Sequence, residues 1–375
     1  MKTAFIYTDA FLDYDYGPTH PLRIIRLKLT YELIKAYGLL NLPSVQFIST
    51  LKAEEENAAI FHSQEYLNIL RQANEGFLPG DAYVYGLGPG DNPIFPGLFN
   101  WSLLVTGATL QAVDFVVDGK GEIAFNIAGG LHHAMRSRAS GFCYMNDPVI
   151  GIMRLLSRGK RVAYIDIDAH HGDGVQKAFY ETKQVLTISL HETGYTLFPG
   201  TGFEYEIGEG EGEGYSVNLP FPPFTGDEIY LWAFEEVVPE LIHAFQPDVV
   251  VTQLGADTFY DDPLTNLHLS IRGYEKVLKR IKDLAPKWVA LGGGGYNISN
   301  VARAWTLAWA VMNGIELKEE LPESYLKEAM RMGIEEKELM GRLKIPLHSQ
   351  NKENRMEMER VVHTIKEVVL PKIKG

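Results

Sequence analysis

Short apolar segments rich in Val, Ile, Phe and Tyr alternate along the chain with longer segments of helical periodicity. The short segments predict eight strands, at residues 3–7, 45–48, 122–127, 161–166, 184–190, 215–219, 248–254 and 287–291. The longer segments predict helices at residues 21–37, 97–117, 148–158, 226–244, 270–284 and 298–312. Segments such as VVVTQL and WVALGG do not alternate apolar with polar positions, which is typical of parallel strands covered by helices on both faces. We therefore predict an α/β fold with a central, eight-stranded, mostly parallel sheet flanked by helices.

No tract rich in Ser, Gly or Pro interrupts this alternation, so we expect a single domain. From Glu316 onward the chain becomes rich in Lys and Glu. This last part predicts a helix with one apolar face, made by Val361, Val362, Ile365, Val368 and Val369. We expect that face to pack against the flank of the sheet or against a partner chain.

Composition and charge exclude several classes of protein. With 375 residues, 46% of them hydrophobic, the chain can bury a large core without disulfides. The net charge is −13, from 35 Lys and Arg against 48 Asp and Glu, which has the wrong sign for holding nucleic acid or an anionic membrane. The longest uncharged stretch, residues 92–113, contains Pro and Asn and is too polar to span a membrane. We predict no nucleic-acid or membrane partner.

Cysteine usage indicates a reducing compartment. Cys143 is the one cysteine and cannot form an internal disulfide. Asp9, Asp13 and Asp15 interrupt the start of the chain before the apolar core of a signal peptide could form. We therefore expect a cytoplasmic protein.

The most informative motif, IDIDAHHGDG at residues 165–174, directly follows a predicted buried strand. In an open α/β sheet, ligands bind beyond the carboxyl ends of the strands. Asp166, Asp168 and His170 recur at every second position, so an extended backbone would direct all three side chains to the same side. A single Asp or His would most simply cap the next helix or face solvent. The density of Asp and His in this motif instead predicts a metal site.

The strand predicted at residues 248–254 also runs out into a carboxylate, Asp257. Asp168, His170 and Asp257 together offer nitrogen and oxygen ligands and leave room for water. Zinc accepts this set, and three protein ligands with an open position are typical of catalytic zinc, whereas structural zinc sites are usually rich in Cys. With one Cys in the chain, we predict a catalytic metal.

Two adjacent histidines, His132 and His133, follow the strand predicted at residues 122–127. An isolated pair would equally well line a polar turn. Hydrolysis at a metal also needs a base for the attacking water and an acid for the leaving amine, and a carboxylate bonded to imidazole fixes its tautomer and basicity. Asp166 and Asp173 can supply such carboxylates, so these four residues are candidates for proton transfer.

Tyr296 follows four consecutive glycines at the end of the last predicted strand. A glycine run by default makes a tight turn. It also lets the backbone approach a ligand closely, and the Tyr296 hydroxyl would then be free to bond to a developing oxyanion. By itself the segment leaves both interpretations open.

Other conspicuous features predict structure and no chemistry. The segment GEGEGEG at residues 208–214 lacks the spacing of phosphate loops, and its glutamates would repel phosphate, so we expect a turn between strands. The chain has no G-x-S-x-G motif, which argues against a serine hydrolase of that type. We interpret Cys143 as a small buried hydrophobe, and Trp305 and Trp309, at helical spacing, as core residues.

Seven motifs, taken in order, resemble those of the zinc-dependent lysine deacetylases of the arginase–deacetylase fold, especially class I histone deacetylases and bacterial acetoin-utilisation deacetylases. They are HPLR (20–23), DNP (91–93), GGLHH (129–133), GFCYMND (141–147), DIDAHHGDGVQ (166–176), FPGTG (198–202) and GGGGY (292–296). The match extends from about residue 5 to residue 313. It implies that residues 1–315 are a deacetylase-like catalytic domain and residues 316–375 a charged helical extension of that domain.

The resemblance implies catalytic and metal roles for the matching positions. It makes Asp168, His170 and Asp257 the zinc ligands. It pairs His132 with Asp166 and His133 with Asp173, with His133 as the expected general base and acid, and it makes Tyr296 the hydroxyl that polarises the substrate carbonyl. Potassium usually accompanies the zinc in such enzymes, at positions that correspond here to Asp166, Asp168, His170, Ser189 and Leu190, and to Phe179, Thr182, Val185 and Tyr215.

The resemblance also implies a narrow channel for an acyl-lysine. Phe142, next to Gly141, and Phe198 are expected to form its walls. Leu264 is expected at its rim, and Asp91 is expected to hold the backbone of the substrate.

Departures from related families narrow the predicted reaction. Arginases hold two manganese ions and need a carboxylate two residues before the position of Asp257, where this chain has Gly255. Deacetylases of polyamines tend to place an acidic residue at the channel mouth, where this chain has the neutral Leu264, although Asp91 and Asp262 keep this alternative open. We therefore predict hydrolysis of N-ε-acetyl-lysine in proteins or peptides, with an acetylpolyamine or another small amide as the alternative. An inactive binding module is disfavoured because every catalytic position is filled.

Overall fold

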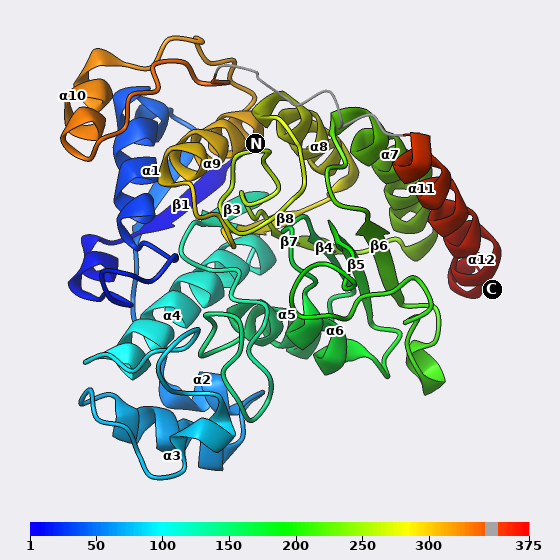
Figure 1. Ribbon diagram of the computed structural model, residues 1–375, viewed down its shortest axis with the longest axis horizontal. Helices are drawn as coiled ribbons and strands as arrows, with labels where there is room; N and C mark the ends of the chain where they lie inside the picture. Colours follow the sequence, from blue (N-terminus) through cyan, green and yellow to red (C-terminus); the bar gives the residue numbers. More distant parts are fainter. Residues whose placement is uncertain (342–351, 375) are drawn as a thin grey trace.

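The computed structural model describes residues 1–341 and 352–374 and contains a central eight-stranded sheet (Figure 1). The strands are β1 (Thr3–Tyr7), β2 (Val45–Ser49), β3 (Ile123–Asn126), β4 (Val162–Asp166), β5 (Val185–Glu192), β6 (Ser216–Phe221), β7 (Val249–Gln253) and β8 (Trp288–Leu291). Their order across the sheet is β2-β1-β3-β8-β7-β4-β5-β6, and all neighbours are parallel. The predicted α/β fold and the predicted strands are confirmed.

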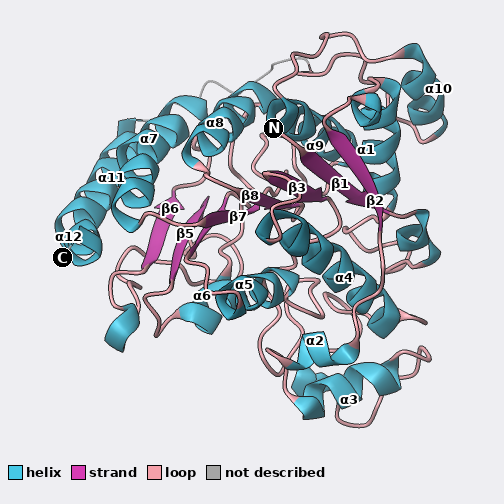
Figure 2. Cartoon of the chain, turned by 180° about the vertical axis from the view of Figure 1, so that it is seen from behind, coloured by secondary structure: helices cyan, strands magenta, loops and turns pink. Residues whose placement is uncertain are grey.

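Helices cover both faces of the sheet (Figure 2). They are α1 (Ile25–Ala36), α2 (Glu55–Ala59), α3 (Gln64–Ala73), α4 (Leu98–Val117), α5 (Asp147–Ser157), α6 (Asp173–Phe179), α7 (Asp227–Phe245), α8 (Ile271–Leu284), α9 (Ile298–Asn313), α10 (Glu323–Arg331), α11 (Lys352–Thr364) and α12 (Leu370–Lys374). Helices α4, α5 and α6 lie on one face, and α1, α9, α8 and α7 lie on the other. The six long helices predicted from the sequence correspond to α1, α4, α5, α7, α8 and α9.

The core lies between the sheet and these two helical layers. Every residue of β1, β3, β4, β7 and β8 is buried, which explains why these segments do not alternate apolar with polar positions. The predicted core residues Trp305 and Trp309 are fully buried in α9. The uncharged stretch at residues 92–113 includes most of α4, a helix buried along most of its length. Among the described helices, none is long and apolar enough for a membrane crossing.

The end of the chain packs on the same molecule. Helices α11 and α12, joined by a π-helical turn over Ile365–Val369, contact α7 (Figure 1). Four of the five valine and isoleucine residues predicted to share a face are buried, but Val368 is 43% exposed. Val368 lies in the π-helical turn, which holds more residues than an α-helical turn and so changes the period on which the prediction rested.

Strand order decides which loops meet. Strands β3, β8, β7 and β4 are consecutive neighbours in the middle of the sheet, and because they are parallel their carboxyl ends share one edge. The segments that follow them begin at residues 127, 292, 254 and 167. The predicted catalytic residues lie in these four segments, apart from Asp166, which is the last residue of β4, so the topology brings them together at this edge.

Candidate active site

Asp168, His170 and Asp257 form a buried cluster beyond the ends of β4 and β7. Their potential ligand atoms all lie within 4.8 Å of one another. Nδ1 of His170 is 3.0 Å from Oδ1 of Asp168 and 3.1 Å from Oδ2 of Asp257. The remaining carboxylate oxygens accept backbone N–H groups, from Gly294 to Asp168 Oδ2 at 2.7 Å and from Ala169 to Asp257 Oδ1 at 2.9 Å. The structure thus places the three predicted ligands together and fixes their orientation.

Burial of two carboxylates in one cluster is electrostatically unfavourable without a cation. Burial and the neighbouring charge of Asp168 raise the pKa of Asp257 to about 7. Burial alone would lower the pKa of His170, but hydrogen bonds to both carboxylates raise it well above its usual value. A divalent cation would neutralise both carboxylates and leave the imidazole neutral, so the donor set fits a metal such as zinc.

Asp166 does not join this cluster, although the period-two pattern placed it on the same side as Asp168. Strand β4 ends at Asp166, and the backbone then bends, with the N–H of Asp168 donating to Oδ1 of Asp166 at 3.1 Å. Oδ2 of Asp166 instead lies 2.7 Å from Nδ1 of His132. The bend therefore separates a metal cluster from an imidazole–carboxylate pair.

The two adjacent histidines form two such pairs. Nδ1 of His133 is 2.7 Å from Oδ1 of Asp173, at the start of α6. Both rings are buried. Burial opposes charge on His132, but Asp166 and Asp168 raise its pKa to about 9, whereas burial and the charge of His132 lower the pKa of His133 to about 4. Near neutral pH the pair therefore holds one charged and one neutral imidazole.

The turn that carries these histidines is held by the start of α5. Oδ2 and Oδ1 of Asp147 accept the N–H groups of Gly130 and Leu131 at 3.1 and 2.9 Å. The side chain of Asn146 donates to the carbonyls of His132 and Ala134 at 3.0 and 2.9 Å. The GFCYMND motif therefore contributes to the site through its last two residues as well as through Gly141 and Phe142.

Tyr296 lies beside His170 of the metal cluster, in the segment after β8. Its ring is perpendicular to that of His170, with centroids 6.3 Å apart, and 5.7 Å from that of Phe142. Burial raises the pKa of its hydroxyl well above the usual value, so the group is a neutral donor. The glycine run allows a close approach, because a Cβ on Gly294 would stand 2.1 Å from Oδ2 of Asp257.

Aromatic rings flank the cluster on two sides. Phe198 packs edge-to-face on His133, with centroids 5.0 Å apart, while Phe142 packs on Tyr296. Gly141 lies close against both of these rings, since a Cβ there would stand 2.4 Å from the His133 ring and 2.9 Å from the Phe198 ring. Its φ is +49° and that of Phe142 is +68°, so the turn presents Phe142 in a left-handed conformation.

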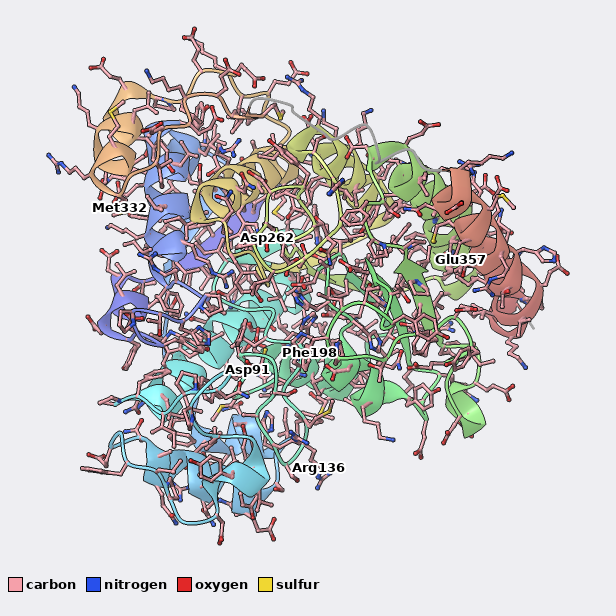
Figure 3. All side chains as sticks on the ribbon, viewed as in Figure 1. Asp91, Arg136, Phe198, Asp262, Met332 and Glu357 are labelled. Atoms are coloured by element: carbon pink, nitrogen blue, oxygen red, sulfur yellow. The ribbon has the colours of Figure 1, made fainter. Side chains whose placement is uncertain are left out.

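Three of the residues predicted to contact the substrate are accessible. Phe198 is 43% and Leu264 37% exposed, and Asp91 is also exposed. Figure 3 labels Asp91, Phe198 and Asp262 in the central part of the view. The backbone carbonyl of Asp91 accepts a hydrogen bond from Nε2 of His20 at 3.2 Å, which anchors the DNP motif to the HPLR motif.

The positions expected near potassium lie in and around β5. Ser189 and Leu190 belong to β5, with Ser189 paired in register with Asp166 of β4. Phe179 ends α6, Thr182 lies in the connection to β5, Val185 begins β5, and Tyr215 directly precedes β6. The expected potassium sites remain predictions, on residues of β5 and of the segments that precede β5 and β6.

Sequence reasoning missed Gln253 and Tyr164. Nε2 of Gln253, at the end of β7, donates to Oδ2 of Asp168 at 2.6 Å, and the hydroxyl of Tyr164 donates to Oδ2 of Asp166 at 2.7 Å. The signal for Gln253 was a lone amide in an otherwise apolar strand. Cys143, in contrast, is buried, and burial raises the pKa of its thiol, which agrees with its interpretation as a buried hydrophobe.

Comparison with known proteins places the chain in a family. The histone deacetylase domain matches residues 20–312. The acetoin utilization protein AcuC of Bacillus subtilis is 41% identical over 332 residues, covering 86% of this chain and 85% of the relative. Histone deacetylase 1 of Homo sapiens is 40% identical over 324 residues, covering 86% of this chain and 66% of the relative.

A solved structure is similar over nearly the whole chain. A histone deacetylase homologue in complex with SAHA superposes with a TM-score of 0.89 at 37% sequence identity. The superposition covers 98% of this chain and 100% of that chain. The likeness therefore includes both the sheet and the segments that build the candidate site.

Proposed function

The chain belongs to the histone deacetylase family of hydrolases, and on this premise we propose that it hydrolyses the N-ε-acetyl amide of lysine in proteins or peptides to lysine and acetate. The observation that carries the proposal is the juxtaposition of a buried Asp168–His170–Asp257 cluster with two imidazole–carboxylate pairs. Metal-assisted amide hydrolysis needs these two components, a cation site and a proton carrier beside it.

We propose that Asp168, His170 and Asp257 hold one zinc ion. When bound, zinc supplies a Lewis acid that polarises the acyl carbonyl and acidifies water. The same ligand set would also accept iron or cobalt. Zinc is the metal that we expect, because three protein ligands with an open position are typical of catalytic zinc. We also expect potassium at the positions around β5 that the family resemblance implies.

We propose that His133 moves the protons. Because its Nδ1 faces Asp173, Nε2 is the atom that can take a proton from water and return it to the leaving amine. Its neutral state near pH 7 suits the first of these steps. His132, charged and hydrogen-bonded to Asp166, supplies positive charge beside the developing oxyanion. The hydroxyl of Tyr296 donates a hydrogen bond to that oxygen.

We propose that the acyl-lysine stem lies between Phe142 and Phe198, with Gly141 beside it and Leu264 at the rim. The two rings pack on opposite partners, Tyr296 and His133, which supports a narrow apolar slot leading to the cluster. The exposed Asp91 carboxylate is available to accept backbone N–H groups of a peptide. A cytoplasmic location stays a prediction that rests on cysteine usage.

The decisive experiment compares acetate release from an acetyl-lysine peptide and from acetyl-spermidine by the same zinc-loaded preparation. We expect turnover of the peptide, loss of that turnover with a zinc chelator, and inhibition by SAHA, which is bound in the solved neighbour. Turnover of the polyamine alone would keep the mechanism and overturn the substrate. No turnover of either would contradict the proposal.

Asp168→Ala provides the matched metal control. Because this variant lacks one of the three ligands, it should lose both bound zinc and turnover. Elemental analysis measures the zinc content. Full zinc occupancy in this variant would contradict the ligand assignment.

A further inference from the structure

The position of Tyr296 depends on anchors outside its own segment. Four glycines precede it, and Gly293 and Gly295 have φ angles of +136° and +131°. Glycine has the greatest backbone freedom of any residue, so such a run does not by itself hold the following side chain in one place. The hydrogen bonds that the segment makes with its neighbours must therefore hold the backbone that carries the ring.

Asp262 supplies the nearest of these anchors. Its Oδ2 accepts the N–H of Tyr296 at 2.9 Å and that of Asn297 at 3.4 Å. Its Oδ1 accepts the N–H of Leu264 at 3.0 Å. One carboxylate, only 7% exposed, thus joins the segment after β7 to the segment after β8. It also links the rim residue Leu264 to Tyr296.

A second anchor lies on the other side of the Tyr296 peptide. Nη1 of the buried Arg26 donates to the carbonyl of Gly295 at 2.9 Å. Asp262 and Arg26 therefore hold the same peptide unit by its N–H and its C=O. Hydrogen bonds to charged groups are stronger than neutral ones, so this pair restrains the peptide despite the glycines before it.

We propose that Asp262 is a positioning residue that holds the Tyr296 hydroxyl at the substrate carbonyl. The inference rests on the proposed deacetylase function, because it assigns Asp262 a role through Tyr296. Three N–H donors converge on this side chain, and a carboxylate can accept all three. An amide of the same size cannot, because its NH2 group would face one of the donors.

The adjacent residue offers a matched control. Asp261 is exposed, and it accepts the side-chain amides of Asn297 and Asn300 at 3.1 and 2.6 Å. The peptide N–H of Tyr296 donates to Asp262 and not to Asp261. Asp261→Asn therefore removes the same charge from the same segment without removing the anchor of Tyr296.

The test is a double-mutant cycle between Asp262 and Tyr296 at pH 8. Wild type, each single variant and the double variant are compared on the acetyl-lysine peptide. A misplacement of about 1 Å at a reacting group can lower the rate about 100-fold. We expect Asp262→Asn to lower kcat by about 10- to 100-fold with little change in KM or zinc content, and Asp261→Asn to remain near wild type. In the Tyr296→Phe background, Asp262→Asn should lower kcat no further.

Equal losses from Asp262→Asn in both backgrounds would overturn the proposal, because Asp262 would then act independently of the hydroxyl. So would equal losses from the Asp261 and Asp262 variants. If Asp262→Asn does not fold, Asp262→Ser, which is smaller and also removes the charge, enters the same cycle.

A measurement without turnover separates this inference from the proposed function. Hydrogen–deuterium exchange of the segment containing Tyr296 and Asn297 should be faster in Asp262→Asn than in wild type, and unchanged in Asp261→Asn. Unchanged exchange in Asp262→Asn would overturn the positioning role even in an active enzyme. Faster exchange in a protein inactive on the peptide would instead support the positioning role and reject the proposed substrate.

Discussion

His132 and His133 are neighbours in the sequence, yet each imidazole is bonded to a different carboxylate, and their Nε2 atoms face each other at 3.0 Å. The carboxylate partners come from different elements, Asp166 from the end of β4 and Asp173 from the start of α6. The electrostatic result is asymmetric, because the charge on His132 disfavours a second charge on His133. Two chemically identical side chains are thereby held in different protonation states near neutral pH.

This asymmetry predicts unequal effects of removing the two rings. His133→Asn should lower kcat by about 10²- to 10⁴-fold, since it removes the neutral imidazole that takes the proton. His132→Asn leaves that imidazole in place and should lower kcat by about 10- to 100-fold. Steady-state acetate release, with zinc content measured for each variant, checks the prediction. A larger loss for His132→Asn would reverse the assigned roles.

Tyr296→Phe should keep zinc and thermal stability but lower kcat by about 10²- to 10³-fold, because only the hydroxyl that donates to the oxyanion is lost. Tyr195→Phe, at an 81% exposed tyrosine, serves as the control and should behave as wild type. Near-normal turnover of Tyr296→Phe would remove this hydroxyl from the mechanism.

Gly294→Ala should weaken zinc binding. An added Cβ would stand 2.1 Å from Oδ2 of Asp257 and 2.6 Å from Oδ2 of Asp168, so both ligands must move. Changes to the groups that orient metal ligands typically lower the metal affinity by about 10- to 100-fold. Competition with a chromophoric chelator measures the affinity. Gly80→Ala, whose Cβ would meet no atom within 4 Å, is the control, and equal affinities in the two variants would contradict the prediction.

His62 should make folding stability sensitive to acid. Its Nε2 accepts the N–H of Asn146 at 3.0 Å, its Nδ1 lies 3.3 Å from the carbonyl of Arg136, and burial lowers its pKa from 6.5 to about 4. Above pH 6.5 neither the folded nor the unfolded state binds this proton, so His62 adds no pH dependence. Between pH 6.5 and 4 the unfolded chain binds this proton and the folded chain does not. Lowering the pH through this range therefore lowers the free energy of unfolding.

The expected size of the effect follows from one proton. The free energy of unfolding should fall by about 1.4 kcal/mol per pH unit from this residue in that range. In His62→Gln, whose amide can keep one donor and one acceptor, the slope should be shallower by that amount, while His243→Gln, at an exposed position of α7, should keep the wild-type slope. Denaturant titrations at several pH values measure it, and parallel slopes for wild type and His62→Gln would contradict the prediction.

Local sequence patterns were sufficient for the strands and the long helices, because side-chain periodicity depends only on near neighbours in the chain. The short helix α3 was missed although its signal was present, with Ser63 as N-cap and Tyr66, Leu67, Leu70 and Ala73 buried on one face. Helix α6 was missed for a different reason: its seven residues are too few to establish a period.

The sequence alone determined the α/β class of the fold and the chemical groups at the strand ends. It also supplied, through the resemblance, the pairs His132–Asp166 and His133–Asp173, which the structure places at 2.7 Å each. Only the tertiary structure decided which distant residues complete the site: Gln253 on Asp168, Asp147 on the histidine turn and Asp262 on Tyr296. These contacts depend on β3, β8, β7 and β4 lying next to one another, and strand order is set by packing of the whole core, which no local pattern encodes.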